Sequence, residues 1–139
     1  MFLDCTCFRV RRLSRQLTQL YDDALRPTGL RVTQFSMLSA LRNEGPMTVV
    51  ALSQGLGADS TSVSRALRPL MDKGFASLDD GADKRSKSVS LTEAGHKKLS
   101  EADLLWEVAQ NKVANLLSPD WREQFDKELD QISERMRKS

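Results

Sequence analysis

Residues 60–71 read S-T-S-V-S-R-A-L-R-P-L-M, and this stretch decides the fold. Its apolar residues recur at i, i+3, i+4, i+7 and i+8, which is one buried stripe of an α-helix: Val63, Ala66, Leu67, Leu70 and Met71. Asp59 or Ser60 is the expected N-cap, because a side-chain oxygen there accepts a hydrogen bond from a free backbone N–H. Pro69 predicts a kink rather than an end, since the stripe continues past it to a stop at Gly74.

A shorter helix is expected immediately before this one. Thr48 is its expected N-cap and Gly57 stands where a left-handed helix end is favoured. Its inward-facing residues are Val49, Leu52 and Leu56. Two short helices joined by a tight turn that contains glycine are typical of a helix-turn-helix.

A β-hairpin is expected after the helix pair. Residues 75–79 and 88–91 are short and partly alternating, which predicts two strands. The polar segment between them contains Gly81 and three cations, which are Lys84, Arg85 and Lys87. A helix-turn-helix followed by a hairpin with a cationic tip indicates a winged helix.

Amphipathic helices are expected on both sides of this winged part. The first ends before Pro27, and its stripe comprises Leu3, Cys7, Val10, Leu13, Leu17, Leu20 and Ala24. A shorter helix follows with Phe35, Met37, Leu38 and Leu41. After the hairpin, Thr92 caps a helix of about 25 residues and Ser118 caps a last one. The predicted fold is mainly α with a small β-hairpin wing: a winged helix-turn-helix with terminal dimerisation helices.

Composition narrows the class of protein. The chain has 139 residues, of which 40% are hydrophobic and 29% charged, as expected for one globular domain with one core. No apolar run is long enough to cross a bilayer and residues 1–10 do not resemble a secretion signal, so we expect no membrane partner. The two cysteines, Cys5 and Cys7, are too few and too close to staple a fold, which favours a cytoplasmic protein. The net charge of +2 does not by itself indicate an anionic partner.

The outer face of the helix at residues 60–71 suggests what the fold binds. Opposite its buried stripe lie Thr61, Arg65 and Arg68, flanked by Ser62 and Ser64. Short hydroxyls and guanidinium groups suit a helix that enters the DNA major groove, because they donate to phosphates and base edges without blocking close approach. The alternative is a solvated face without a partner.

The hairpin tip is the second candidate contact. Arg85 on a β-turn can reach a narrow minor groove, whose negative potential attracts a thin cation, and Asp83 is two residues away to orient it. The alternative is an ordinary charged turn.

Residues 83–95, D-K-R-S-K-S-V-S-L-T-E-A-G, resemble the wing signature of the MarR family of bacterial transcription regulators. The segment V-S-R-A-L at 63–67 and G-L-R-V-T-Q-F-S-M-L at 29–38 extend the resemblance to nearly the whole chain. It implies that the wing Arg85 enters the minor groove, that Asp83 supports it, and that the helix with Ser64 and Arg65 reads the major groove. One departure is Ser88, with Lys87 beside it, where a second arginine often stands. The predicted DNA-binding residues are Thr61, Ser62, Ser64, Arg65, Arg68, Asp83, Lys84, Arg85 and Lys87.

A homodimer is expected because the terminal stripes exceed what one small winged helix can bury, and each large apolar side chain left in water forgoes about 1.5–3 kcal/mol. A twofold partner covers such a surface and sets two reading helices about one DNA turn apart, on a pseudo-palindromic duplex operator. Residues 31–91 are the predicted DNA-binding part, and residues 1–30 and 92–139 the dimerisation helices. The resemblance implies the same interface. The alternative is an intramolecular bundle.

The signal that would control such a regulator is less well defined by the sequence. Cys7 is predicted to lie on the apolar stripe of the first helix and Cys5 off it, about 200° apart, with Arg9, Arg11 and Arg12 near enough to favour a thiolate. The Cys7-Phe8 pair with Tyr21 is similar to the first helix of the family's organic hydroperoxide sensors, although Arg11 and Val32 stand where those carry tyrosines. That similarity implies a repressor released when Cys7 is oxidised near Tyr21 of a second copy. Two alternatives stay open: Cys7 is purely structural, buried at the dimer interface, or the effector is a small aromatic or phenolic ligand in the cleft between the DNA-binding part and the dimer helices.

No enzyme is expected. The one histidine, His96, falls in the first turn of a helix beside two lysines, and no metalloprotease, phosphate-loop or nucleophile-elbow motif is present. Cys5, Cys7 and His96 lack the spacing of a zinc site, so no metal or cofactor is predicted. The remaining alternative is a winged helix that binds protein instead of DNA.

Overall fold

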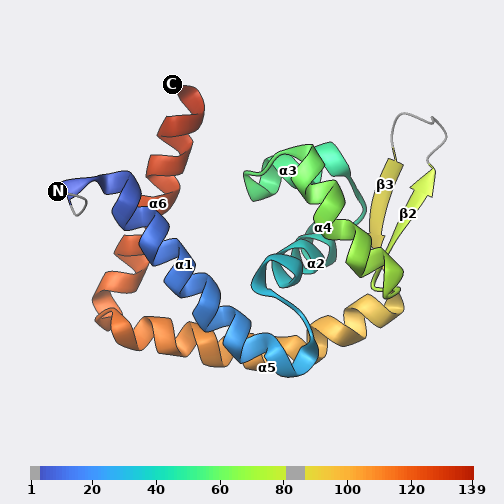
Figure 1. The fold of residues 1–139 in the computed structure, drawn as a ribbon, viewed down its shortest axis with the longest axis horizontal. Coiled ribbons are helices and arrows are strands. Elements are labelled where there is room, and N and C mark those ends of the chain that lie inside the picture. The colour runs from blue at the N-terminus through green and yellow to red at the C-terminus, as the bar shows by residue number, and fades with distance from the viewer. Residues whose placement is uncertain (1–3, 81–86) are drawn as a thin grey trace. The chain divides into compact units, whose positions relative to one another are not determined.

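A computed structural model describes residues 4–80 and 87–139 and shows a mainly helical chain with a small sheet (Figure 1). Its helices are α1 (Thr6–Leu25), the 3-10 turn η2 (Arg26–Thr28), α2 (Val32–Glu44), α3 (Val49–Leu56), α4 (Ser60–Asp72), α5 (Glu93–Leu116) and α6 (Pro119–Lys138). Its strands are β1 (Met47–Thr48), β2 (Ala76–Asp80) and β3 (Lys87–Leu91). The predicted fold class, with its wing, is confirmed.

The sheet has one strand more than the sequence predicted. Its order is β1-β3-β2, all antiparallel, with Met47 and Leu78 on either side of Val89. Two residues are too few for strand periodicity, so β1 had no signal in the sequence. The expected strands at 75–79 and 88–91 were each off by one residue at one or both ends. The hairpin tip, residues 81–86, lies outside the described residues.

Helix ends follow the predicted chemistry around the helix pair. The Ala51 backbone N–H donates to Thr48 Oγ1 at 3.1 Å, and the Ser62 N–H donates to Asp59 Oδ1 at 2.8 Å. Gly57 has φ +66°, the left-handed region that favours glycine. α4 continues through Pro69 to Asp72. At α6, Ser118 is the N-cap residue as expected, but its side chain makes no capping hydrogen bond.

The start of α1 corrects one expectation. Cys5 has extended backbone angles and lies just before the helix, which begins at Thr6. Cys5 and Cys7 are therefore not two positions on one regular helix, and the predicted separation of about 200° does not apply. Both side chains are exposed in the single chain.

One core joins α2 to the helix pair, the sheet and the first half of α5. Its members from these elements include Leu38, Leu41, Leu52, Leu67, Leu70, Val89, Leu99 and Ala102. α2 contributes four buried residues to it: Phe35, Met37, Leu38 and Leu41. The helix pair and α5 thus share α2 as a common support.

The chain forms two compact units, one ending at Trp106 and the other comprising Glu107–Ser139. The division falls inside α5, which is one continuous helix. In the second unit, large apolar side chains stand in solvent: Val108, Leu116, Trp121, Leu129, Ile132 and Met136. Within the first, Val10 and Leu13 of α1 are also exposed.

The junction between β2 and α5 requires a glycine. A Cβ on Gly95 would lie 2.1 Å from the carbonyl oxygen of Phe75 and 2.5 Å from Leu91 Cδ1. Neither the backbone carbonyl nor the packed leucine can move far enough to relieve these contacts. α5 therefore approaches the sheet this closely only because residue 95 has no side chain.

Gly95→Ala is expected to lower the free energy of unfolding by about 1–3 kcal/mol, because the added methyl overpacks this junction. Gly55→Ala is the matched control, since Gly55 lies in α3 with open space around it, and it should raise stability by about 0.5–1 kcal/mol. Urea unfolding followed by circular dichroism measures both. Equal stability of the two variants would contradict this account of Gly95.

Candidate nucleic-acid interface

α4 presents a polar outer face, which we call the reading face: Thr61, Ser62, Ser64, Arg65 and Arg68, all exposed. The inner face of the same helix is buried through Val63, Leu67 and Leu70. In the described part of the chain, neither Arg65 nor Arg68 has an ion-pair partner, so both guanidinium groups keep their donors for a ligand. Asp72, the acid of α4, lies at the opposite end from Thr61.

The N-cap of α4 uses one member of the reading face. The Ser62 hydroxyl donates to Asp59 Oδ2 at 2.7 Å, and the Ser62 backbone N–H donates to Oδ1 of the same carboxylate. These two hydrogen bonds hold the pKa of Asp59 below its ordinary value, and the one from the Ser62 hydroxyl has the larger effect. The capping carboxylate therefore stays charged at neutral pH. Ser62 therefore has its hydroxyl proton committed within the helix, whereas Thr61 and Ser64 do not in the described structure.

Only part of the predicted wing contact lies within the described residues. Lys87 begins β3, exposed, with Asp80 as its strand neighbour. Asp83, Lys84 and Arg85 fall in the segment 81–86, outside the described residues.

The base of the hairpin is tied to α4 and to α5 through one residue. The Thr92 hydroxyl donates to the carbonyl of Gly74 and accepts from the Gly95 N–H, which caps α5 as predicted. The Thr92 N–H also donates to the Phe75 carbonyl at 3.1 Å. The end of the reading helix, the wing and the start of α5 therefore meet at this point.

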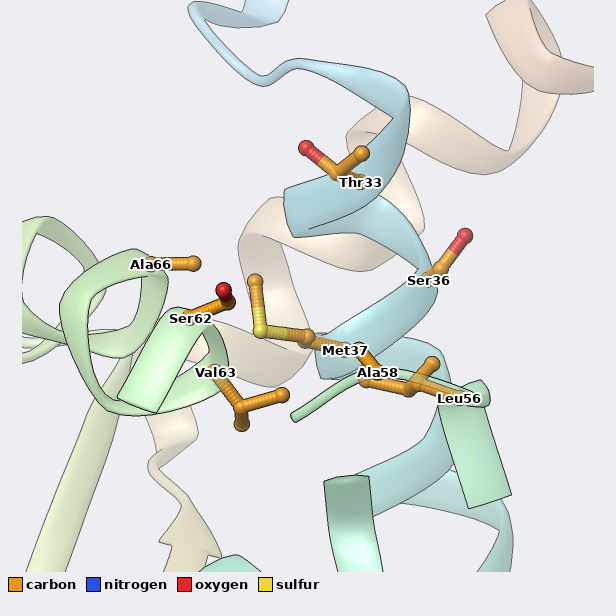
Figure 2. Close-up of a pocket in the computed structure, with 8 residues that line it drawn as sticks. All are labelled: Thr33, Ser36, Met37, Leu56, Ala58, Ser62, Val63 and Ala66. Carbon is orange, nitrogen blue, oxygen red and sulfur yellow. The ribbon is translucent and has the colours of Figure 1, made fainter. Parts of the chain in front are cut away.

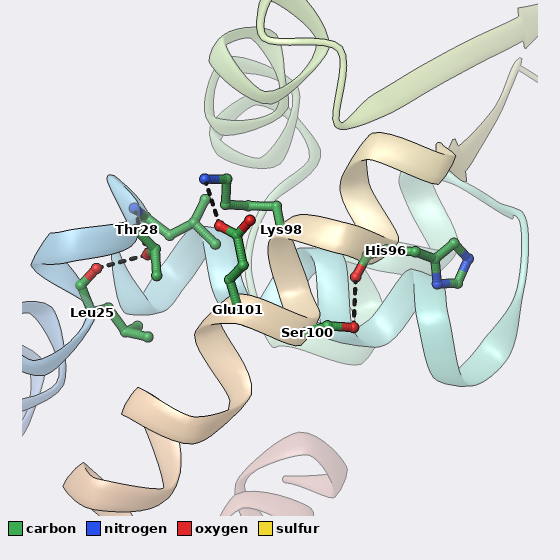
Figure 3. Close-up of polar contacts among 7 residues, drawn as sticks. Leu25, Thr28, His96, Lys98, Ser100 and Glu101 are labelled. Carbon is green, nitrogen blue, oxygen red and sulfur yellow. Dashed lines mark hydrogen bonds and ion pairs between the residues drawn. The ribbon is translucent and has the colours of Figure 1, made fainter.

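The first turns of α5 carry polar contacts of their own (Figure 3). Lys98 Nζ lies 3.1 Å from Glu101 Oε2 and 5.7 Å from the centre of the Phe75 ring. His96 is exposed, and its backbone carbonyl accepts from the Ser100 hydroxyl. Lys98 thus adds a second link between α5 and the base of the hairpin.

A hollow of about 400 Å³ lies between α2 and α4 (Figure 2). Three hydroxyl residues contribute to its lining, Thr33, Ser36 and Ser62, and the remaining lining is apolar: Met37, Leu56, Ala58, Val63 and Ala66. This hollow could not be predicted from the sequence, because its walls come from segments about 30 residues apart and are ordinary core and cap residues. It lies within the winged part itself, whereas the predicted ligand cleft was to lie between that part and the dimer helices.

The residues of the predicted redox input are far apart in one chain. Cys7 is exposed near the start of α1 and Tyr21 is half-buried near its end. The two residues are 14 positions apart on α1, which is about 21 Å along the helix axis, so one chain cannot bring them into contact. Any contact between these two positions requires two copies of the chain.

Within residues 4–80 and 87–139, no group of three histidine, cysteine or acidic side chains is arranged to hold a metal ion. No helix of the described chain is both long and apolar enough to span a membrane.

The sequence is similar to known regulators. A family model described as MarR family matches residues 28–86. An uncharacterized HTH-type transcriptional regulator of Bacillus subtilis, YwoH, is 32% identical over 120 residues, which cover 86% of this chain and 84% of that protein.

Solved structures show the same arrangement. The M. tuberculosis transcriptional regulator MosR in complex with DNA superposes with a TM-score of 0.82 and 36% identity, covering 96% of this chain and 98% of the other. A MarR variant from E. coli complexed with operator DNA has a TM-score of 0.80 over 88% of this chain and 89% of its own. Because its sequence is only 22% identical, this likeness shows a shared fold and nothing more. These proteins are described as transcriptional regulators or as MarR, in agreement with the expectation of a regulator that is not an enzyme.

Proposed function

Because the chain belongs to the MarR family of transcriptional regulators, we propose that it binds a pseudo-palindromic DNA operator as a homodimer and represses transcription until an effector releases it. The observation that carries the proposal is the reading face of α4. Its two arginines have no ion-pair partner among the described residues and lie beside exposed hydroxyls, while Val63, Leu67 and Leu70 are buried on the inner face. The related regulator MosR, which was crystallised with DNA, supports a duplex as the ligand. Such a target implies action in the cytoplasm.

The reading face has the right chemistry for a major groove. Thr61 and Ser64 are short enough for the backbone of α4 to approach the base edges, and their hydroxyls donate or accept. Arg65 and Arg68 bind phosphates or the paired acceptors of guanine. We assign a second contact to the wing through Arg85, with Asp83, Lys84 and Lys87 beside it, on the strength of the sequence signature.

Salt dependence separates DNA from a protein ligand. Each phosphate contact releases counterions and adds about 0.9 to the slope of log K against log salt. A winged helix that docks on a protein surface through the same face has no such counterion release. The slope therefore reports which class of partner the reading face takes.

Dimerisation is supported by apolar surface that one chain leaves in solvent. Ile132 of α6 is 55% exposed and Leu116 of α5 is 74% exposed. Each large side chain of this kind gains about 1.5–3 kcal/mol when it is fully buried. We propose that residues 1–30 and 92–139 bury it against a second copy, and that residues 31–91 bind DNA. A twofold axis then presents two reading faces to two half-sites about one helical turn apart.

The proposed effector is an oxidant that acts on Cys7. The Cys7 thiol is exposed in the single chain, where an oxidant can reach it. A hydroperoxide transfers one oxygen to that sulfur to give a sulfenic acid and is itself reduced to an alcohol. The second candidate is a small aromatic or phenolic effector, with Cys7 purely structural. Its most direct support is the hollow beneath the reading face, whose apolar wall and three hydroxyls match such a ring.

Arg65→Ala and Arg85→Ala are each expected to weaken operator binding by about 1–3 kcal/mol while the fold is kept, because each removes a charge-assisted contact to DNA. The operator is obtained by sequencing genomic fragments that the purified protein retains, and affinity is measured by mobility shift over a range of salt. Lys97→Ala, an exposed cation on α5, is the control and should bind normally. No affinity of the wild type for any duplex at low ionic strength, reduced or oxidised, would refute the proposed function.

Ile132→Asp is expected to dissociate the dimer, because a buried unpaired carboxylate costs far more than the apolar contact it replaces. Sedimentation at micromolar concentration should give twice the chain mass of 15.6 kDa for the wild type and the single mass for the variant. Val50→Asp changes an equally exposed apolar residue on α3 and should stay dimeric. A monomeric wild type would contradict the two-site arrangement and favour an intramolecular bundle.

Cys7→Ser is expected to keep operator binding but to lose release by an organic hydroperoxide, because the serine hydroxyl is not oxidised. Cys5→Ser serves as the matched control and should still release. Both variants are titrated with peroxide on the bound operator and then with thiol, which should restore wild-type binding. If Cys7→Ser releases as the wild type does, oxidation of Cys7 is not the input.

A further inference from the structure

α5 is fastened to α2 at two neighbouring points. Arg42 Nη1 donates to Asp103 Oδ2 at 2.9 Å and Nη2 donates to Oδ1 at 3.1 Å. One turn further along α5, the Trp106 ring stacks on Phe35 with centroids 5.7 Å apart and an interplanar angle of 18°. We call these four residues the α2–α5 clamp.

The clamp has the chemistry of an orienting contact. A guanidinium that donates two parallel hydrogen bonds to one carboxylate fixes direction as well as distance. The hydrogen bond to Asp103 raises the pKa of Arg42 above its ordinary value, so the guanidinium keeps its charge. The stacked rings add a second contact on the same pair of helices. Two contacts, seven residues apart on α2 and three apart on α5, restrict rotation of one helix on the other.

α2 carries the effect of the clamp to the reading face. Its buried residues Leu38 and Leu41 belong to the same core as Leu67 and Leu70 of α4. The reading helix is therefore held on one part of α2 while α5 is held on another. Because packed helices do not deform continuously, the direction of α5 relative to the reading face follows from these two contacts.

The position of the clamp along α5 decides what it controls. Trp106 is the last residue of the first compact unit, and α5 continues from there as one helix to Leu116. The clamp thus lies just before α5 enters the second compact unit, whose exposed apolar side chains we assign to the dimer interface. Resting on the proposed function, we infer that Arg42, Asp103, Phe35 and Trp106 are positioning residues that set which spacing of operator half-sites the dimer accepts.

The test uses full-length protein and operator duplexes whose two half-sites are moved apart or together by one and two base pairs. Each base pair rotates a half-site by about a tenth of a turn, so a rigid dimer should lose about tenfold or more in affinity on a shifted operator. Asp103→Asn removes the negative charge of the clamp and leaves the positive charge of Arg42. Arg42→Lys keeps the charge but loses the fork. Both are expected to reduce that discrimination severalfold while dimer mass and affinity for a single half-site stay as in the wild type.

Two control variants separate positioning from general stability. Ser39→Ala lies on α2 between Phe35 and Arg42 and removes a buried hydroxyl that has no partner in the described chain, so it should keep the wild-type spacing preference. Trp106→Phe retains a stacking ring and should also keep it.

Each result has one meaning. Unchanged spacing discrimination in both clamp variants, with normal operator binding by the wild type, overturns the inference and leaves the proposed function intact. Loss of single half-site affinity in Arg42→Lys also overturns it, because the pair then supports the fold of the reading part. A wild type that binds no duplex overturns the proposed function instead. Should Asp103→Asn fail to fold, Arg42→Lys decides the question, with Trp106→Phe as its control.

Discussion

The burial of α2 is the constraint on which the rest of this structure depends. Phe35, Met37, Leu38 and Leu41 are all buried, and α3 and α4, with eight and 13 residues, are short enough to be marginal as isolated helices. They hold their shape because Leu52, Leu67 and Leu70 pack into the same core. The orientation of the reading face is therefore a property of packing on α2, and only secondarily of the propensity or capping of α4 itself.

Side chains that this core does not use are the ones available for function. The outer residues of α4 contribute little to folding, so their hydroxyl and guanidinium groups are free of structural demand, apart from the Ser62 hydroxyl that serves the Asp59 cap. The exposed apolar residues of α6 present the opposite case. Trp121, Ile132 and Met136 are exposed in the single chain and do not stabilise it, and they form the surface that the proposed second copy would cover.

Sequence reasoning succeeded where the signal is local. The stripe of α4, the Thr48 cap, the left-handed Gly57 and the Thr92 cap each depend on residues within a few positions of one another, and all were predicted correctly. Asp59, the cap of α4, was one of two predicted candidates beside Ser60. The errors have equally physical reasons. β1 is too short for periodicity, and Cys5 lies at a helix start where apolar spacing does not mark the first turn. The clamp gave no signal because Arg42 and Asp103 are 61 positions apart, and nothing in the sequence distinguishes them among 21 basic and 19 acidic residues.

The structure also indicates how a change in the terminal helices can reach the reading face. Asp22 of α1 accepts a hydrogen bond from the Val32 N–H at the start of α2, at 2.8 Å, while Arg42 near its end holds Asp103 of α5. α1 and α5 are thus attached to opposite ends of one rigid helix. A shift of α1 relative to α5 must therefore tilt α2 or break one of these two contacts, and a tilt of α2 carries α4 with it through their shared core. The two proposed inputs, oxidation of Cys7 and a ligand beneath α4, would act at opposite ends of this connection.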